Sequence, residues 1–272
     1  MLGKLIKYDI RSTWRDFAGI YLSILLGVII LPFVFNNISN NFIVATGGFI
    51  AFGIIVAVIV ITIISLFKIF NTNIFSKQGY LTLTLPVTSR QILSSKLIVS
   101  TMWIVSTMIV STIGLLIFAL LIAPFPFIDI INGIRSIIAQ LNGLGISTIL
   151  LLVLAIIVSA VKEVAKLFLS CSIAHLKQFN RFRVLVGVLS YFAFSWGETI
   201  IVQGVALIGS PFFKDQTLLI NQFNSISNLE SLQDVMGLFN WVIGLAILYG
   251  VLLTLAYSVM NIWILNNKVD LD

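Results

Sequence analysis

The chain has 272 residues, of which 59% are hydrophobic and 10% charged, and its mean hydropathy is +1.12. A soluble domain carries about 25% charged residues, so this composition excludes a soluble enzyme, a disordered chain and a nucleic-acid-binding module. The net charge is +6, and the single cysteine (Cys171) and single histidine (His175) leave no intramolecular disulfide and no histidine cluster for a metal. The composition predicts an all-α polytopic membrane protein.

Residues 1–16 combine basic and apolar positions at helical spacing. At about 100° per residue, four cations fall within an arc of roughly 80°: Lys4, Lys7, Arg11 and Arg15. The other side of the helix carries Leu2, Ile6, Ile10, Trp14 and Phe17. This pattern predicts an N-terminal interfacial amphipathic helix with its apolar face in the acyl boundary and its cations toward headgroups and cytosol. The alternative is an ordinary basic leader with no helix of its own.

Six stretches are long and apolar enough to cross a bilayer, which takes about 20 residues. They are residues 17–35, 42–70, 97–123, 146–173, 184–209 and 237–265. Because they account for most of the chain, residues 1–272 are expected to form a single transmembrane domain with no folded soluble domain.

The distribution of Lys and Arg predicts the orientation of these spans. Six spans place the connections alternately on the two sides of the membrane. Of the 16 basic residues, only Arg135 and Lys214 fall in the connections on the side opposite the termini. The others lie in the N-terminal segment, the connection between the second and third spans, the exit of the fourth span and the C-terminus. Both termini are therefore expected to face the cytoplasm. The net charge is a topology signal and gives no support to nucleic-acid binding.

The connection between the second and third spans, residues 71–96, combines two kinds of local structure. Pro86 disfavours helix at Leu85, so residues 80–85 are expected to be extended or irregular. Thr88 with Gln91 three residues later is a capping-box pattern, which predicts a short helix over residues 88–96. That helix is expected to leave Arg90 and Lys96 available to water or to a partner. A simple connection needs only a few polar residues, so the capped helix suggests a docking surface.

The segment from Gly79 to Lys96 reads GYLTLTLPVTSRQILSSK and resembles the GYLTFTLPVTxxQ…K signature in permease subunits of bacterial ABC-2-type exporters. Residues 167–173 (LFLSCSI), with the basic loop that ends at Arg183, are similar to the end of the fourth span in that family. Residues 257–272 are similar to its C-terminal end. Six spans with both termini inside fit the same pattern, so the resemblance covers essentially the whole chain.

The resemblance implies that residues 71–96 carry a cytoplasmic coupling helix, which inserts into a groove of a separate cytoplasmic ABC ATPase. This role falls to Thr88, Ser89, Arg90, Gln91, Ile92, Leu93 and Lys96. The resemblance also implies a connecting helix at Met1–Asp16 and short re-entrant helices within residues 211–235. It further implies a second copy of the permease or a paralogue, ATP and Mg²⁺ on the partner subunit, and a place in the bacterial cytoplasmic membrane.

The chain itself contains no motif for ATP hydrolysis or another catalytic reaction. Gly48 and Gly53 have the internal spacing of a phosphate-binding loop, but Ile54 and Ile55 follow where the motif requires Lys and Ser or Thr. One histidine, one cysteine and two carboxylates within the spans do not assemble the site of a known membrane enzyme. The chain is expected not to be an enzyme and to hold no cofactor.

Two polar features interrupt the spans. Glu198 lies past the middle of the fifth span, where a charge is costly and marks a functional site by default. It either faces a cavity or a partner, or is neutral and hydrogen-bonded, or is wetted near the outer interface. Lys162, Glu163 and Lys166 lie in the fourth span. They either snorkel to the cytoplasmic boundary, which is the favoured interpretation, or line the inner mouth of a substrate path or contact anionic headgroups. No titratable partner for Glu198 is evident on the other spans.

Together these features predict the permease subunit of an ABC exporter, which moves a substrate using ATP hydrolysed by a separate subunit. Few intramembrane charges argue against a sugar or a small ion as cargo, so an amphipathic or hydrophobic peptide, drug or lipid is expected. Membrane lipids are the other expected partners. Two alternatives remain: a secondary transporter, and a non-transporting membrane scaffold or toxin-immunity protein.

Overall fold

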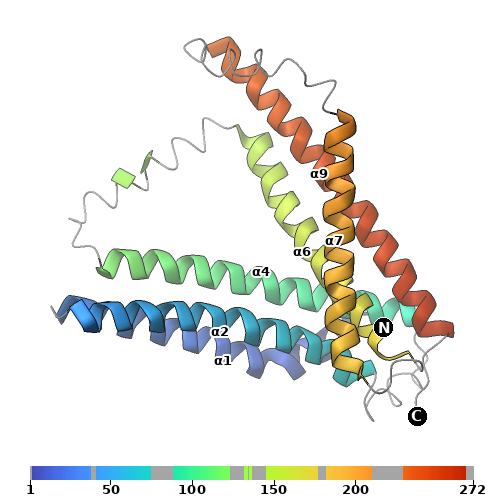
Figure 1. Ribbon diagram of the computed structural model, residues 1–272, viewed down its shortest axis with the longest axis horizontal. Coiled ribbons are helices and arrows are strands. Elements are labelled where there is room, and N and C mark those ends of the chain that lie inside the picture. Colours follow the sequence, from blue (N-terminus) through green and yellow to red (C-terminus); the bar gives the residue numbers. More distant parts are fainter. Residues whose placement is uncertain are drawn as a thin grey trace. The chain divides into compact units, whose positions relative to one another are not determined.

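The computed structural model describes residues 2–37, 41–74, 88–122, 132–133, 135–136, 145–176, 182–209 and 229–267. Six long α-helices make up nearly all of this part of the chain, and no β-strand occurs within it. They are α1 (Leu2–Asn37), α2 (Asn41–Ile74), α4 (Ser89–Ile122), α6 (Ile146–Ala174), α7 (Arg183–Gly209) and α9 (Leu229–Asn267) (Figure 1).

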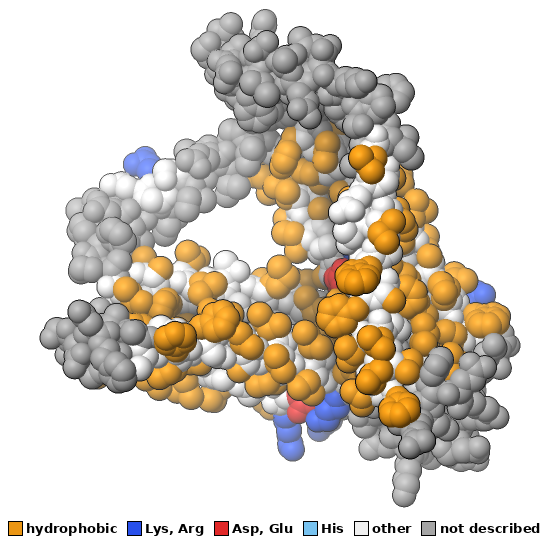
Figure 2. Space-filling view, viewed as in Figure 1, with side chains coloured by type: hydrophobic (Ala, Val, Ile, Leu, Met, Phe, Trp, Pro, Cys, Tyr) orange, Lys and Arg blue, Asp and Glu red, His pale blue; other side chains and the backbone are white. Residues whose placement is uncertain are grey.

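Each of the six helices contains a segment that is long and apolar enough to cross a membrane. Hydrophobic side chains cover most of the visible surface of the described residues, and Lys and Arg are confined to a few small patches (Figure 2). A surface of this kind suits acyl chains rather than water, because soluble monomers rarely expose apolar area on this scale. For the described residues, the predictions of an all-α fold and of six helices that could span a membrane are confirmed, and both agree with a multi-pass membrane protein.

Two helices are longer than the spans predicted for them. α1 runs unbroken over 36 residues, so residues 2–16 and the first span form one helix. α4 begins at Ser89 and continues for 34 residues, so the helix predicted at residues 88–96 forms the first turns of the third span. No Pro lies at either change from polar to apolar composition, and α1 continues through Gly19 without a break. The structure thus shows one helix where the sequence analysis expects two.

The chain forms two compact units. Unit 1 comprises Met1–Gln140 with Leu271–Asp272, and unit 2 comprises Leu141–Asp270. The prediction of a single transmembrane domain stays a prediction.

In unit 1, α1 packs along both α2 and α4, while α2 and α4 meet each other much less. The buried core follows one face of α1 at helical spacing and adds residues from the other two helices: Phe17, Ile20, Ile24, Val28, Leu66, Ile69, Val99 and Trp103. Phe17 stacks on Trp103 with ring centroids 4.4 Å apart and planes inclined by 2°. Residues from successive turns of α1 therefore fix how α4 lies against it.

In unit 2, α6 packs against both α9 and α7. α9 approaches α6 closely at Gly250, because a Cβ built there would lie 2.8 Å from Val158 Cγ1. Small residues allow helices to approach in this way in membranes. Farther along the same helices, the Ser172 hydroxyl donates a 2.7 Å hydrogen bond to Asn261 Oδ1, and both side chains are buried.

Several predictions fall on residues outside the described part. The expected extended segment at residues 80–85 lies there, as does most of the connection at 211–235. α9 begins at Leu229, eight residues before the predicted start of the sixth span at residue 237, so the last part of that connection is helical.

Candidate functional site

The first candidate site is the start of α4, which carries the residues predicted to dock an ATPase. The Thr88 carbonyl accepts hydrogen bonds from the backbone N–H groups of Gln91 at 2.9 Å and Ile92 at 3.2 Å. Thr88 therefore occupies the N-cap position that the sequence predicts. Because α4 continues without interruption into the apolar segment, this cap also begins the third candidate span.

The first turns of α4 have an exposed face and a buried face. Thr88, Arg90 and Gln91 are exposed. On the other face Ile92 is 4% exposed and Leu93 and Lys96 are each 2% exposed, whereas Ser89 is half-buried. The expectation that Lys96 is available to water or to a partner is therefore wrong in this chain. Of the residues predicted to dock, the exposed set is Thr88, Arg90 and Gln91.

Lys96 is buried because it pairs with a carboxylate of α1. Its Nζ lies 3.0 Å from Asp9 Oδ1, and the two side chains are 3% and 5% exposed. The Ser95 hydroxyl donates to Asp9 Oδ2 at 3.2 Å. One turn further along α1, Trp103 Nε1 donates to Thr13 Oγ1 at 2.9 Å. These polar contacts join the beginnings of α1 and α4.

Sequence reasoning missed Asp9 as a site residue. Because Asp9 lies between Lys7 and Arg11, its sequence context suggests only a charged N-terminal segment. The available signal is its angular position, because at about 100° per residue Asp9 lies roughly opposite the centre of the basic arc. A carboxylate that faces away from its basic neighbours indicates a partner on another helix.

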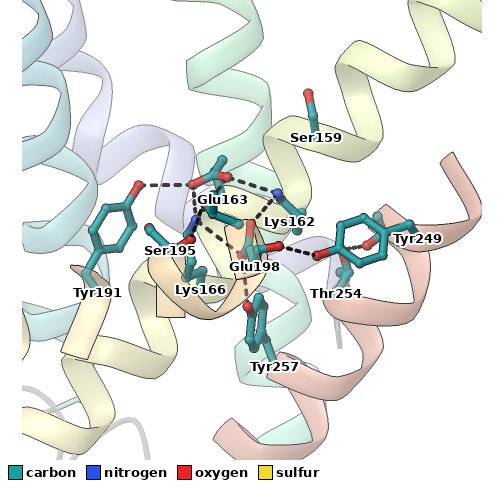
Figure 3. A network of polar contacts seen from close by, with 12 residues as sticks. Ser159, Lys162, Glu163, Lys166, Tyr191, Ser195, Glu198, Tyr249, Thr254 and Tyr257 are labelled. Carbon is teal, nitrogen blue, oxygen red and sulfur yellow. Dashed lines mark hydrogen bonds and ion pairs between the residues drawn. The ribbon is translucent and has the colours of Figure 1, made fainter. Parts of the chain in front are cut away.

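The second candidate site is a polar network within unit 2, centred on Glu198 of α7 (Figure 3). Lys162 Nζ of α6 lies 2.7 Å from Glu198 Oε2, and Lys166 Nζ lies 3.3 Å from Glu198 Oε1. The Tyr257 hydroxyl of α9 donates to Glu198 Oε1 at 2.8 Å. One carboxylate thus joins all three helices of the unit, and its side chain is only 11% exposed.

Glu163 forms the outer side of the network. Its carboxylate lies 2.9 Å from Lys166 Nζ and 3.3 Å from Lys162 Nζ, and it accepts a 3.0 Å hydrogen bond from the Tyr191 hydroxyl. Lys166 Nζ also lies over the ring of Tyr191, 4.9 Å from its centroid. The Glu163 side chain is 41% exposed and is the most accessible of the four charged groups.

The four charges alternate in sign, so the network carries no net charge. Burying an isolated charge in a low-dielectric interior is costly, and pairing offsets that cost. Lys162 lies twelve residues before the end of α6, which is about 18 Å along the axis. Its side chain bends to Glu198 instead of extending toward the helix end, so the snorkelling interpretation of Lys162 and Lys166 is wrong. The expectation that Glu198 lacks titratable partners on other spans is wrong as well.

His175 caps the end of α6, and its Nδ1 lies 2.9 Å from the Cys171 carbonyl. Burial lowers the pKa of His175, and the positive charge of Arg183 acts in the same direction. The Cys171 side chain is fully buried. Within the described residues, no group of three or more His, Cys, Asp and Glu side chains is placed to hold a metal ion.

No family model, no curated protein and no solved structure matches this chain. Membership of the ABC-2 permeases stays a prediction that rests on the resemblance at residues 79–96, 167–183 and 257–272.

Proposed function

We propose that this chain is the permease subunit of an ATP-driven exporter in the bacterial cytoplasmic membrane, with both termini in the cytoplasm. A separate ABC ATPase supplies ATP hydrolysis, and a second copy of the permease or a paralogue completes the pathway. The cargo is an amphipathic or hydrophobic peptide, drug or lipid. The observation that carries this proposal is the exposed start of α4, braced from behind by the buried Asp9–Lys96 pair.

The geometry of α4 suits the transfer of a displacement from a docked partner into the third candidate span. A partner that presses on Arg90 and Gln91 meets an exposed surface, while the opposite face is buried in unit 1. The Asp9–Lys96 ion pair and the Phe17–Trp103 stack hold α1 against α4. Because α4 continues from Ser89 to Ile122 without a break, its displacement extends into the span and is not absorbed at a hinge.

The network around Glu198 supports a transport function within the same proposal. Ionisable groups inside apolar spans are costly, and in membrane proteins they often mark pathways for substrates or ions. We assign Lys162, Glu163, Lys166 and Glu198 to the substrate path, with Glu163 at its accessible edge. The Tyr191 ring beside Glu163 adds a surface for an amphipathic cargo.

A secondary transporter is the second candidate, and one observation favours it. Three helices of unit 2 contribute titratable side chains to one network, and ion-coupled transporters use such groups near the bilayer midplane. A transporter of this kind would operate without an ATPase.

The test of the proposal is co-purification of the tagged chain from its native membrane, followed by a measurement of ATP hydrolysis in the complex. We expect an ABC ATPase to co-purify and hydrolyse ATP, and Arg90→Glu with Gln91→Glu to reduce both its recovery and the activity. The control is Arg135→Glu, because Arg135 is also exposed but lies in another connection. An active complex that tolerates the Arg90 and Gln91 changes contradicts the docking assignment.

A further inference from the structure

The outward face of α1 carries an unusual concentration of positive charge. Its four cations are all exposed, and no ion pair joins them to any other residue in the described ranges: Lys4, Lys7, Arg11 and Arg15. Two aromatic side chains bracket them, since Tyr8 is 64% exposed and Trp14 is 55% exposed. At about 100° per residue, these six side chains share an arc of roughly 120°.

The apolar face of the same segment is partly covered by protein. Phe17 is fully buried, and Ile6 and Ile10 pack against the core of unit 1. This face therefore packs at least in part on protein, the placement of the segment in the acyl boundary stays a prediction, and Trp14 points outward with the cations instead of lying with the apolar residues. Over residues 4–15, the exposed surface of α1 is a basic face with Tyr8 and Trp14 at its edges.

No acidic group close in sequence neutralises this face. Asp9 and Asp16 are the only acidic residues before Asp129. Asp9 is buried and pairs with Lys96, and Asp16 lies 2.9 Å from Lys68. Both carboxylates are thus engaged by cations from other helices, and the four cations of α1 keep their full charge for an external partner.

We propose that this face is a binding site for anionic phospholipid headgroups. Lys and Arg near a membrane surface attract acidic lipids, and Trp and Tyr settle at the level of the headgroups. An acidic protein surface would use the cations alone, whereas the exposed ring of Trp14, three residues before the apolar run, favours a lipid surface. This site is independent of ATPase docking, which uses the start of α4.

Because α1 is continuous, its four cations lie at different distances from the apolar run, measured along the helix axis. The apolar run begins at Phe17, so Arg15 and Arg11 lie about 3 and 9 Å before it, and Lys7 and Lys4 about 15 and 20 Å before it. The headgroup layer adds only about 5–7 Å on each side of the hydrocarbon. Arg15 and Arg11 therefore lie at or close to the headgroups, and the two lysines act across water over about one Debye length.

The experiment uses the purified full chain in nanodiscs of phosphatidylcholine that contain a trace of spin-labelled phosphatidylglycerol or spin-labelled phosphatidylcholine. The measured quantity is the preference for phosphatidylglycerol among the motionally restricted lipids. The test variant is Arg11→Gln with Arg15→Gln, and the control of equal charge is Lys4→Gln with Lys7→Gln. We expect the arginine variant to lose the larger part of the preference, up to roughly fivefold per cation, and 0.5 M salt to reduce the preference of the wild type.

Three outcomes overturn the proposal. The first is no preference for phosphatidylglycerol in the wild type, and the second is a preference that neither pair of substitutions changes. The third is an equal loss of this preference in both variants. That result would indicate that residues 4–15 lie flat on the membrane surface, with all four cations at the same distance from the headgroups. Helical content by circular dichroism checks that each variant is folded, and the exposure of all four side chains makes this the expected result.

Discussion

Lys162 Nζ lies 2.7 Å from Glu198 Oε2 and joins α6 to α7 within their apolar segments. Neither group would be stable there alone, because a buried charge without a partner costs far more than a paired one. Lys166 and Tyr257 contact the other carboxylate oxygen of Glu198. The three helices of unit 2 are therefore held by one carboxylate, and removing single members of the network has unequal consequences.

The first prediction concerns this ion pair. Lys162→Met and Glu198→Gln each leave an excess charge in the network and are expected to lower the free energy of unfolding by about 3 kcal/mol. The double variant keeps Lys166 paired with Glu163 and restores neutrality, so we expect it to be more stable than either single variant. Thermal unfolding in detergent of the wild type, the two single variants and the double variant measures the coupling between the two residues. Losses that simply add in the double variant would show that the two residues do not interact.

The second prediction separates two tyrosines of α9. Tyr257→Phe removes a 2.8 Å hydrogen bond to the Glu198 carboxylate and is expected to cost about 1–2 kcal/mol of unfolding free energy. Tyr249→Phe is the matched control, because the Tyr249 hydroxyl lies 3.4 Å from the Glu198 backbone carbonyl and bonds weakly. The same thermal measurement compares them. Equal destabilisation by both changes contradicts the role given to Tyr257.

The third prediction compares the two ion pairs of α1. Asp9→Asn leaves Lys96 buried and unpaired, with an expected cost of about 3 kcal/mol. Asp16→Asn removes an exposed pair with Lys68 and is expected to cost less than about 1 kcal/mol. Chemical denaturation of the purified protein distinguishes them. Recovery of stability in Asp9→Asn combined with Lys96→Met would identify the unpaired ammonium as the cause, and no recovery would exclude it.

The fourth prediction tests the close packing of α6 and α9. Gly250→Ala places a methyl group 2.8 Å from Val158 Cγ1, so we expect a loss of about 1–3 kcal/mol from overpacking. Val158→Ala should restore most of it. Gly197→Ala is the control, because nothing lies within 4 Å of a Cβ at that position. A neutral effect of Gly250→Ala would mean that the two helices pack farther apart than the structure shows.

The six candidate spans could be predicted from hydropathy because a bilayer requires long apolar helices. Thr88 could be placed at the start of a helix because its capping pattern is local. The continuity of α1 and α4 could not be predicted, because the composition changes from polar to apolar within each helix. A change of composition alone does not end a helix, and α1 continues through both Gly19 and Pro32.

The polar network could be predicted only in part. The charges of Lys162, Glu163, Lys166 and Glu198 stand out in an apolar sequence, but their pairing depends on which faces of α6 and α7 meet. Tyr191 and Tyr257 give no signal, because a tyrosine in an apolar run looks like any aromatic residue. Equal numbers of positive and negative charges in the fourth and fifth spans are the one clue to the pairing.

The most direct test of the proposed function is transport in proteoliposomes of defined lipid, with a fluorescent amphipathic peptide or lipid as cargo. We expect movement of the cargo only when the permease is reconstituted with its ABC ATPase and ATP, and expect Arg90→Glu with Gln91→Glu to abolish it. Equal transport by the permease alone, driven by an ion gradient and insensitive to ATP, would contradict this account and identify a secondary transporter.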